Sequence, residues 1–108
     1  MTVYVDDMYR LPMGRFRRMK MSHMMADTDD ELHAMADRIR VARKWFQGDH
    51  YDIAITKRVL AVAAGAVEIT TREMAAYSWL KRSRGLVVSP AEAIVRLREF
   101  ARAEVRAQ

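Results

Sequence analysis

The chain has 108 residues, of which 51% are hydrophobic and 31% are charged. This composition is ordinary for a globular protein, and the length fits one domain with a real hydrophobic core. The sequence has no cysteine, which excludes disulfides and thiolate metal sites. No apolar run approaches the roughly 18 residues that span a bilayer. The N-terminus also lacks the apolar segment of a signal peptide. We therefore expect a soluble, cytoplasmic protein that is not associated with a membrane.

The charges are segregated along the chain. The formal net charge is +5, an excess that favours polyanionic partners such as nucleic acid, nucleotides or an acidic host protein. The run RLPMGRFRRMK (residues 10–20) contains only basic charges, whereas DTDDE (residues 27–31) is almost entirely acidic. The last predicted helix is basic again.

The first part of the chain predicts two strands and a helix. TVYV at residues 2–5 is β-branched and aromatic, which is typical of a strand. The basic segment that follows contains Pro and Gly and is expected to be a loop. MSHMMA at 21–26 favours a second strand, with the approach to a helix as the alternative. Thr28 and Glu31 have the spacing of a capping box. They predict a helix to about residue 40 with this buried stripe: Leu32, Met35, Ala36 and Ile39.

The middle of the chain predicts two more strands around an apolar helix. VARKWF at 41–46 indicates a strand, and QGDHYD indicates a turn. The helix that begins near Thr56 is almost wholly apolar, so we expect it to be buried on most sides. Gly65 suits the left-handed position that ends such a helix. AVEIT at 66–70 predicts the fourth strand.

Two further helices are expected to complete the chain. Thr70 and Glu73 form a second capping box, opening a helix to about residue 84. Ser89 followed by Pro90 marks the start of a last, amphipathic helix. Its predicted buried positions are Ile94, Leu97, Phe100, Ala101 and Val105.

Strands that alternate with helices predict an α/β fold. We expect a small, mostly parallel sheet with flanking helices and a C-terminal amphipathic helix. Residues 1–85 are predicted to form the core domain, and residues 86–108 a helical extension packed on it.

Polar residues follow the ends of several predicted strands. In open parallel sheets, ligands bind beyond the carboxyl ends of the strands. One edge would therefore collect a set of candidate metal ligands, with His23 pointing toward the same edge: Asp6, Asp27, His50 and Asp52. Carboxylates and neutral imidazole suit Mg²⁺, Mn²⁺ or Zn²⁺. Without a metal, His50 paired with Asp49 or Asp52 would be a general base.

The basic segment supplies a second set of candidate site residues. Arginine holds phosphate oxygens in a bidentate manner while a metal ion activates water. The predicted phosphate or nucleic-acid contacts are Arg10, Arg15, Arg17, Arg18 and Lys20.

Each of these patterns also has a structural explanation. Helix capping and the helix dipole account for the acidic run at 27–31. Gly-Asp before His50 is itself a turn signal, and a basic segment is often only a solvated loop. Histidines placed like His23 and His33 are more often core or surface residues than ligands.

Four segments resemble the small bacterial and phage proteins grouped as domain of unknown function 4031. They are VYVDD, SHMMADTDDELHAMADRI, RKWFQGDHYDI and KRVLAVAAGAVEI, and they span about residues 2–70. Because that family has no assigned activity, the resemblance implies shared polar residues but no reaction: Asp6, His23, Asp27, Glu31, His33, His50, Tyr51, Asp52 and Arg58. It strengthens the case for all three histidines. The chain departs from the family pattern at Arg40, where a glycine is usual, and the region after residue 71 is expected to lie outside the pattern.

Two functions from different classes follow. The first is a metal-assisted or His/Asp-catalysed hydrolase of a phosphate-bearing substrate, with Arg58 and the basic segment on the phosphate. Its predicted catalytic residues are Asp6, His23, Asp27, His33, His50 and Asp52. The alternative is a non-enzymatic module that binds nucleic acid or an acidic host protein through residues 10–20. Self-association through the last helix is a third, structural role.

Overall fold

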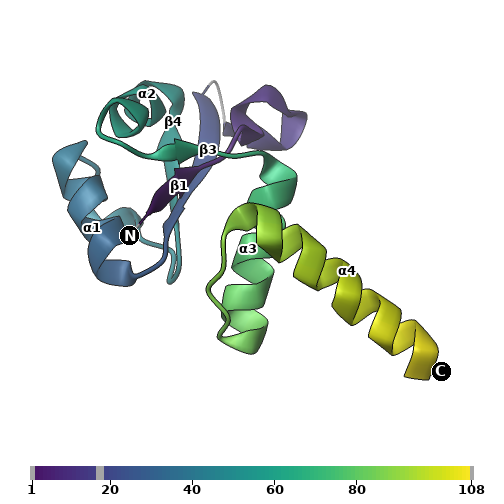
Figure 1. Ribbon diagram of the computed structural model, residues 1–108. Helices are drawn as coiled ribbons and strands as arrows, with labels where there is room; N and C mark the ends of the chain where they lie inside the picture. The colour runs from purple at the N-terminus through teal and green to yellow at the C-terminus, as the bar shows by residue number, and fades with distance from the viewer. Residues whose placement is uncertain (1, 17–18, 108) are drawn as a thin grey trace. The chain divides into compact units, whose positions relative to one another are not determined.

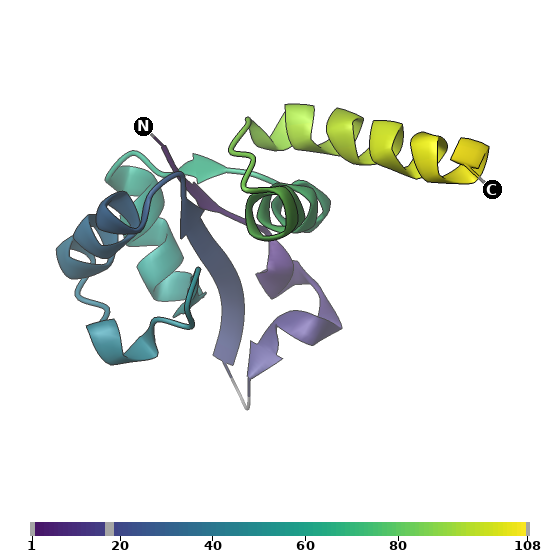
Figure 2. The same cartoon turned by 90° about the horizontal axis from the view of Figure 1, so that it is seen from below.

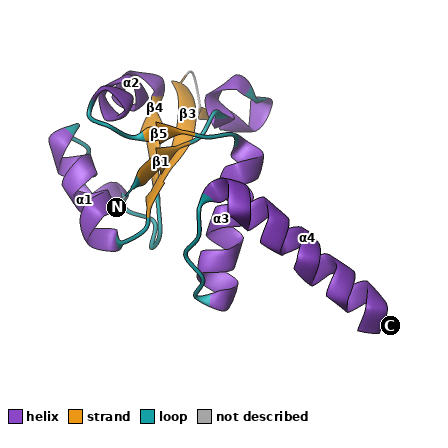
Figure 3. Ribbon diagram, in the orientation of Figure 1, coloured by secondary structure: helices purple, strands orange, loops and turns teal. Residues whose placement is uncertain are grey.

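The structure is a computed structural model that describes residues 2–16 and 19–107. These residues form five strands and four α-helices, together with three single-turn 3-10 helices (Figures 1 and 3). The strands are β1 (Val3–Val5), β2 (Arg15–Phe16), β3 (Met19–Ala26), β4 (Tyr51–Ala54) and β5 (Val67–Glu68). The α-helices are α1 (Asp29–Arg38), α2 (Ile55–Ala63), α3 (Thr71–Arg84) and α4 (Pro90–Ala107). The 3-10 helices are η1 (Met8–Arg10), η2 (Pro12–Gly14) and η3 (Arg43–Trp45).

The fold is α/β as predicted, but the sheet is mixed, so the expectation of a mostly parallel sheet is wrong. β3 pairs antiparallel with both β1 and β4, whereas β1 and β5 are parallel. A parallel pair needs a long crossover, usually a helix. The elements between β1 and β3 are only two or three residues long, so the chain returns antiparallel to β1.

The predicted strand at 41–46 is also wrong. Residues 43–45 form η3, and Phe46 makes an isolated bridge to Tyr51. A tight turn explains this, because the Gln47 amide donates to the His50 carbonyl at 2.9 Å. Pairing before this turn is therefore confined to the bridge, and the chain enters β4 at Tyr51.

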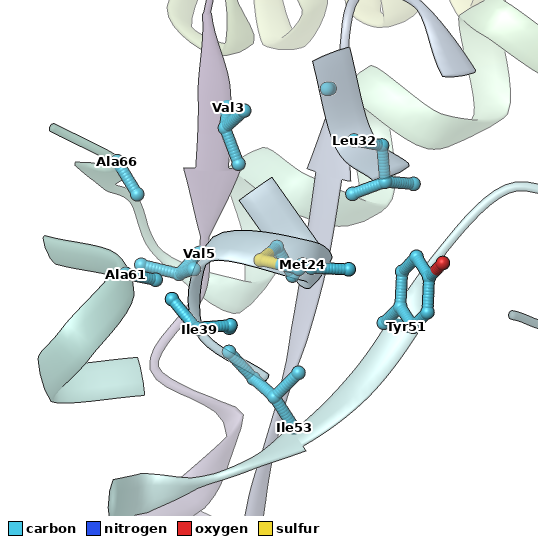
Figure 4. Close-up of a cluster of buried hydrophobic side chains, with 11 residues drawn as sticks. Val3, Val5, Met24, Leu32, Ile39, Tyr51, Ile53, Ala61 and Ala66 are labelled. Carbon is cyan, nitrogen blue, oxygen red and sulfur yellow. The ribbon is translucent and has the colours of Figure 1, made fainter. Parts of the chain in front are cut away.

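One face of the sheet packs against α1 and α2 to form the core (Figure 4). Val5, Met24 and Tyr51 form one register row across β1, β3 and β4, and all three are fully buried. The predicted stripe of α1 is confirmed: Leu32, Ala36 and Ile39 are buried, and Met35 packs beside them. α2 is not buried on most sides, since Val59 and Leu60 are exposed and Ala61 faces the core.

Local signals placed the helix ends well. The Thr28 side chain accepts a hydrogen bond from the Glu31 amide at 3.3 Å and caps α1. Ser89 does the same for the Glu92 amide at 3.2 Å at the start of α4. Gly65 has φ +107°, the left-handed conformation expected after α2.

The chain divides into two compact units, Met1–Thr71 and Arg72–Gln108. Figure 2 shows the helices of the second unit, most of α3 and the long α4. In that unit Arg84 stacks over the rings of Trp79 and Phe100, at 5.7 and 4.6 Å from their centroids. Ala101 and Val105 are exposed, so the predicted buried stripe of the last helix is wrong at its end. The sequence-based division at residue 85 stays a prediction.

No helix within residues 2–16 and 19–107 is long and apolar enough to cross a membrane.

Candidate functional site

Three polar side chains lie side by side across the sheet. His23 in β3 pairs in register with Asp52 in β4. On the other side, the Asp6 amide donates to the His23 carbonyl at 3.1 Å, directly after the end of β1. Successive residues of a strand point to opposite faces. Asp6, His23 and Asp52 therefore occupy the face opposite the core row of Val5 and Met24.

Asp6 fixes the position of the His23 ring. Its carboxylate is fully buried, and Oδ2 lies 2.7 Å from His23 Nδ1. Oδ1 accepts from the backbone amides of His23 at 2.9 Å and Met8 at 3.2 Å. An ionised carboxylate only accepts hydrogen bonds, so Nδ1 of His23 is the donor in this contact. When the ring is neutral, its Nε2 then carries the lone pair.

His50 has the same arrangement from a different element. It lies in the turn before β4, and its Nδ1 is 2.6 Å from Asp49 Oδ1. The Nε2 atom of His50 is 3.5 Å from Asp52 Oδ1, and that of His23 is 3.8 Å from the same oxygen. The two rings meet edge to face, with centroids 5.4 Å apart. Both imidazoles thus turn their Nε2 atoms toward one carboxylate oxygen.

The two carboxylate oxygens of Asp52 differ in their hydrogen bonding. Its Oδ2 accepts from Gln47 Nε2 at 2.8 Å. Its Oδ1 is buried and has no hydrogen-bond partner among the described residues. A buried polar atom without a hydrogen bond is costly, and this one sits between two imidazole nitrogens.

The local charge raises the pKa of His23. The hydrogen bond to Asp6 is the largest cause, and the nearby Asp52 and Asp49 add to it, while burial opposes the shift. The carboxylates therefore favour a cation at this position, whether a proton on the ring or another positive charge in its place.

Residues 3–81 match the protein family described as "Protein of unknown function (DUF4031)". The chain belongs to this family. The resemblance drawn from the sequence is confirmed, and every residue of the His/Asp cluster lies within the matched segment. The DUF4031 match continues into α3, so the expectation that residues after 71 lie outside the family pattern is wrong. No curated protein and no solved structure matches the chain significantly.

Two of the predicted catalytic residues, Asp27 and His33, lie away from the cluster. The Asp27 amide donates to the Thr2 carbonyl at 3.2 Å, at the start of β1, whereas Asp6 follows its end. The antiparallel direction of β3 is the reason, because it carries the end of β3 to the opposite edge. His33 in α1 bonds through Nδ1 to the Tyr51 hydroxyl at 2.8 Å and packs on Phe46.

The predicted phosphate contacts fall into three groups. Arg10, Arg15 and Lys20 line one pocket of about 560 Å³. Arg58 is buried: Nε donates to the Asp6 carbonyl at 2.8 Å, and Nη1 to Glu68 at 2.9 Å. Two further predicted contacts lie outside the described residues: Arg17 and Arg18.

A cleft of about 600 Å³ adjoins the cluster, and sequence reasoning missed it. Gln47 and Asp52 are among its lining residues, together with Arg15, Phe16 and Trp45. The only sequence signal for Gln47 is its place in WFQ, directly before the GDHYD turn. The sequence does not distinguish Phe16 and Trp45 from core residues, because both are simply apolar. Their exposure on the surface of the cleft is visible only in the structure.

Proposed function

We propose that this DUF4031 protein is a metal-assisted hydrolase of phosphate-bearing substrates. One observation carries the proposal: His23 and His50 each bond a carboxylate through Nδ1 and direct Nε2 at Asp52 Oδ1. Histidines that bind metals characteristically donate their other nitrogen to a carboxylate, which fixes the tautomer and strengthens the ligand. Here that arrangement occurs twice around one oxygen.

The three ligand atoms are spaced for one ion. The ligand atoms of His23, His50 and Asp52 all lie within 4.8 Å of one another. Zinc bonds nitrogen and oxygen at about 2.0–2.2 Å in a tetrahedral arrangement, so two ligands of one ion are about 3.3–3.6 Å apart. Small side-chain rotations would close the site. Two imidazoles and one carboxylate favour Zn²⁺ or Mn²⁺ over Mg²⁺, which prefers oxygen ligands.

The cluster is also accessible to a substrate. The side chains of His23, His50 and Asp52 are 32%, 22% and 33% exposed. Three protein ligands with an open side are typical of catalytic metal sites, whereas structural zinc sites use four. A divalent ion held there would lower the pKa of a water molecule toward about 7.

The chain's own residues would organise the hydrolysis. Asp6 and Asp49 orient the two imidazoles by contacting Nδ1, which leaves Nε2 facing the proposed ion, and Gln47 fixes Asp52. Arg15 lines the same cleft as Asp52 and can bind a phosphate oxygen. The oxygen of water would attack phosphorus and release its proton to solvent, the P–O ester bond would break, and the departing oxygen would take a proton from solvent. No oxidant or reductant is needed.

The test is a thermal melt in chelator and then with Zn²⁺, Mn²⁺ or Mg²⁺, on the wild type, His50→Ala and His33→Ala. A ligand at about 100 times its Kd stabilises the native state by about 2.7 kcal/mol, which raises the Tm by about 10 °C. We expect this rise in the wild type and its loss in His50→Ala. His33→Ala is the matched control and keeps the rise, because His33 bonds Tyr51 and not the cluster.

Hydrolysis of bis(p-nitrophenyl) phosphate by the same proteins completes the test. Metal-dependent release of p-nitrophenol is expected from the wild type and from His33→Ala only. A melt that no ion shifts, or a shift that survives His50→Ala, would end the metal proposal.

A non-enzymatic nucleic-acid-binding module is the second candidate function. The observation that favours it is the pocket lined by Arg10, Arg15 and Lys20, whose described lining residues include no carboxylate. This module requires no metal, so binding without any metal-dependent melt would favour it over the hydrolase.

A further inference from the structure

We infer that the phosphate-bearing ligand is single-stranded nucleic acid, with a base in the cleft beside Asp52 and the backbone running over Arg15. The inference rests on the proposed function for its cleavage step. The binding step stands on separate observations, which concern the cleft and the neighbouring basic pocket.

The cleft presents large apolar side chains to solvent. Met13, Phe16 and Trp45 are 69%, 56% and 59% exposed, and all three line it. Exposed apolar groups gathered around one hollow mark a binding surface, since isolated ones are scattered on ordinary surfaces. Two of these are aromatic rings, which stack on nucleobases whatever the base sequence. The apolar part therefore suits a flat, unpaired ring.

The same cleft carries an excess of positive charge. Arg15, Arg40 and Lys57 line it, against the single carboxylate of Asp52. An uncharged apolar ligand would leave these cations without a role, whereas a nucleotide brings a phosphate next to its base. Asp52 belongs both to the cleft and to the His/Asp cluster, so a phosphate bound beside Asp52 would be next to the proposed metal ligands.

Arg15 connects the cleft to a second pocket, and this continuity favours a polymer over a mononucleotide. Arg15 lines both the cleft of about 600 Å³ and the basic pocket of about 560 Å³. The basic pocket adds Arg10 and Lys20, with Arg10 against the ring of Tyr9 at 5.6 Å. A positively charged groove with exposed aromatic rings is the usual way to hold a single strand. Duplex bases are stacked and paired, so they cannot enter the cleft.

The test measures binding of a short oligothymidylate in chelator, so that no metal and no cleavage contribute. Trp79→Phe leaves Trp45 as the only tryptophan, because the chain has two. We expect the Trp45 fluorescence of this variant to be quenched as the oligonucleotide is added. Fluorescence anisotropy of a labelled oligonucleotide then gives the Kd of each further variant.

Two variants and a matched control decide the outcome. Trp45→Ala should weaken binding about 5- to 150-fold, the range for loss of one stacked base. Arg15→Gln should reduce the slope of log K against log salt by about 0.7, the value for one phosphate contact on a single strand. Arg102→Gln removes the same charge from exposed α4 and should change neither value. Melting of each variant shows that it is folded.

Binding that is unchanged in Trp45→Ala and Arg15→Gln overturns the inference. Equal affinity for a duplex of the same length also overturns it, as does a mononucleotide that binds as tightly as the oligonucleotide. Failure of the proposed function looks different: the oligonucleotide binds as expected in chelator, but no ion shifts the melt and none promotes cleavage.

Discussion

Each of the three histidines has a role that its hydrogen-bond partner decides. His23 and His50 bond carboxylates, which keep Nδ1 protonated and leave Nε2 as an electron-pair donor. His33 bonds the phenol of Tyr51 and packs edge-on against Phe46. The same residue type thus serves a candidate site in two cases and the contact between α1 and β4 in the third.

Arg40 is a residue whose backbone conformation conflicts with its side chain. It has φ +60° and lies two residues after the end of α1. This left-handed conformation brings Cβ close to the following carbonyl oxygen, at a cost of about 1–2 kcal/mol for residues other than glycine. A glycine at this place would have no such cost, because it has no Cβ.

We therefore expect Arg40→Gly to stabilise the protein. The relief of strain exceeds the extra chain entropy of glycine, so a net gain of about 0.5–1 kcal/mol is expected, seen as a Tm several degrees higher. Arg40→Ala removes the same side chain but keeps Cβ, and should give no such gain. Equal stabilisation by both substitutions would contradict the strain explanation.

The start of α3 depends on a side chain distant in the sequence. The Asp7 carboxylate accepts from the amide and the hydroxyl of Thr71, the first residue of the helix, at 2.8 and 2.9 Å. Burial by itself would raise the pKa of Asp7, but these bonds from Thr71 outweigh it and the pKa is lowered from 3.8. The charged form of Asp7 therefore stabilises the fold.

The pH dependence of Asp7→Asn tests this capping. A carboxyl whose pKa is lower in the folded state stabilises it above the unfolded pKa, and the gain is lost as pH falls through the folded pKa. We expect wild type to be more stable than Asp7→Asn by about 0.3–1 kcal/mol at pH 7. The gap should close on acidification below about pH 4. Denaturant unfolding at a series of pH values measures it. A gap that is unaffected by pH, or by a Thr71→Val background, would contradict the assignment.

In the first unit of the molecule, the Arg58 side chain contacts several elements that are far apart in the sequence. From α2 it reaches the carbonyl of Asp6 after β1, the carboxylate of Glu68 in β5, and the face of the Tyr9 ring in η1 at 4.9 Å. Its guanidinium is thus engaged inside the unit, next to the carboxylate that orients His23. The guanidinium group carries several N–H donors in fixed directions, so arginine can donate to two acceptors at once.

Arg58→Lys is expected to destabilise the protein by about 1–3 kcal/mol, since one ammonium cannot reach both acceptors and a buried acceptor is left unpaired. Chemical denaturation measures the loss. Arg96→Lys is the matched control, because Arg96 makes an exposed pair with Glu92 on α4 at 3.4 Å. Such pairs contribute only a few tenths of a kcal/mol. Similar losses in the two variants would contradict the bridging role of Arg58.

The sequence by itself determined the features that depend on neighbours a few residues apart. Thr28 and Ser89 cap helices through residues three positions along, and Leu32, Ala36 and Ile39 face the core by helical period. Family membership was also readable, because motifs such as GDHYD and their order are properties of the chain. The same motifs were enough to name candidate site residues: His23, His50, Asp6 and Asp52.

Only the tertiary structure decided which of these residues meet. The antiparallel course of β3 brings His23 between Asp6 and Asp52 and carries Asp27 to the other edge of the sheet. Strand direction and register are set by the connection between strands and by the packing of the core row, which lies on the opposite face from the site. No local pattern around His23 or Asp27 contains that information. The sequence could therefore predict candidate residues of the site but not which of them are in contact.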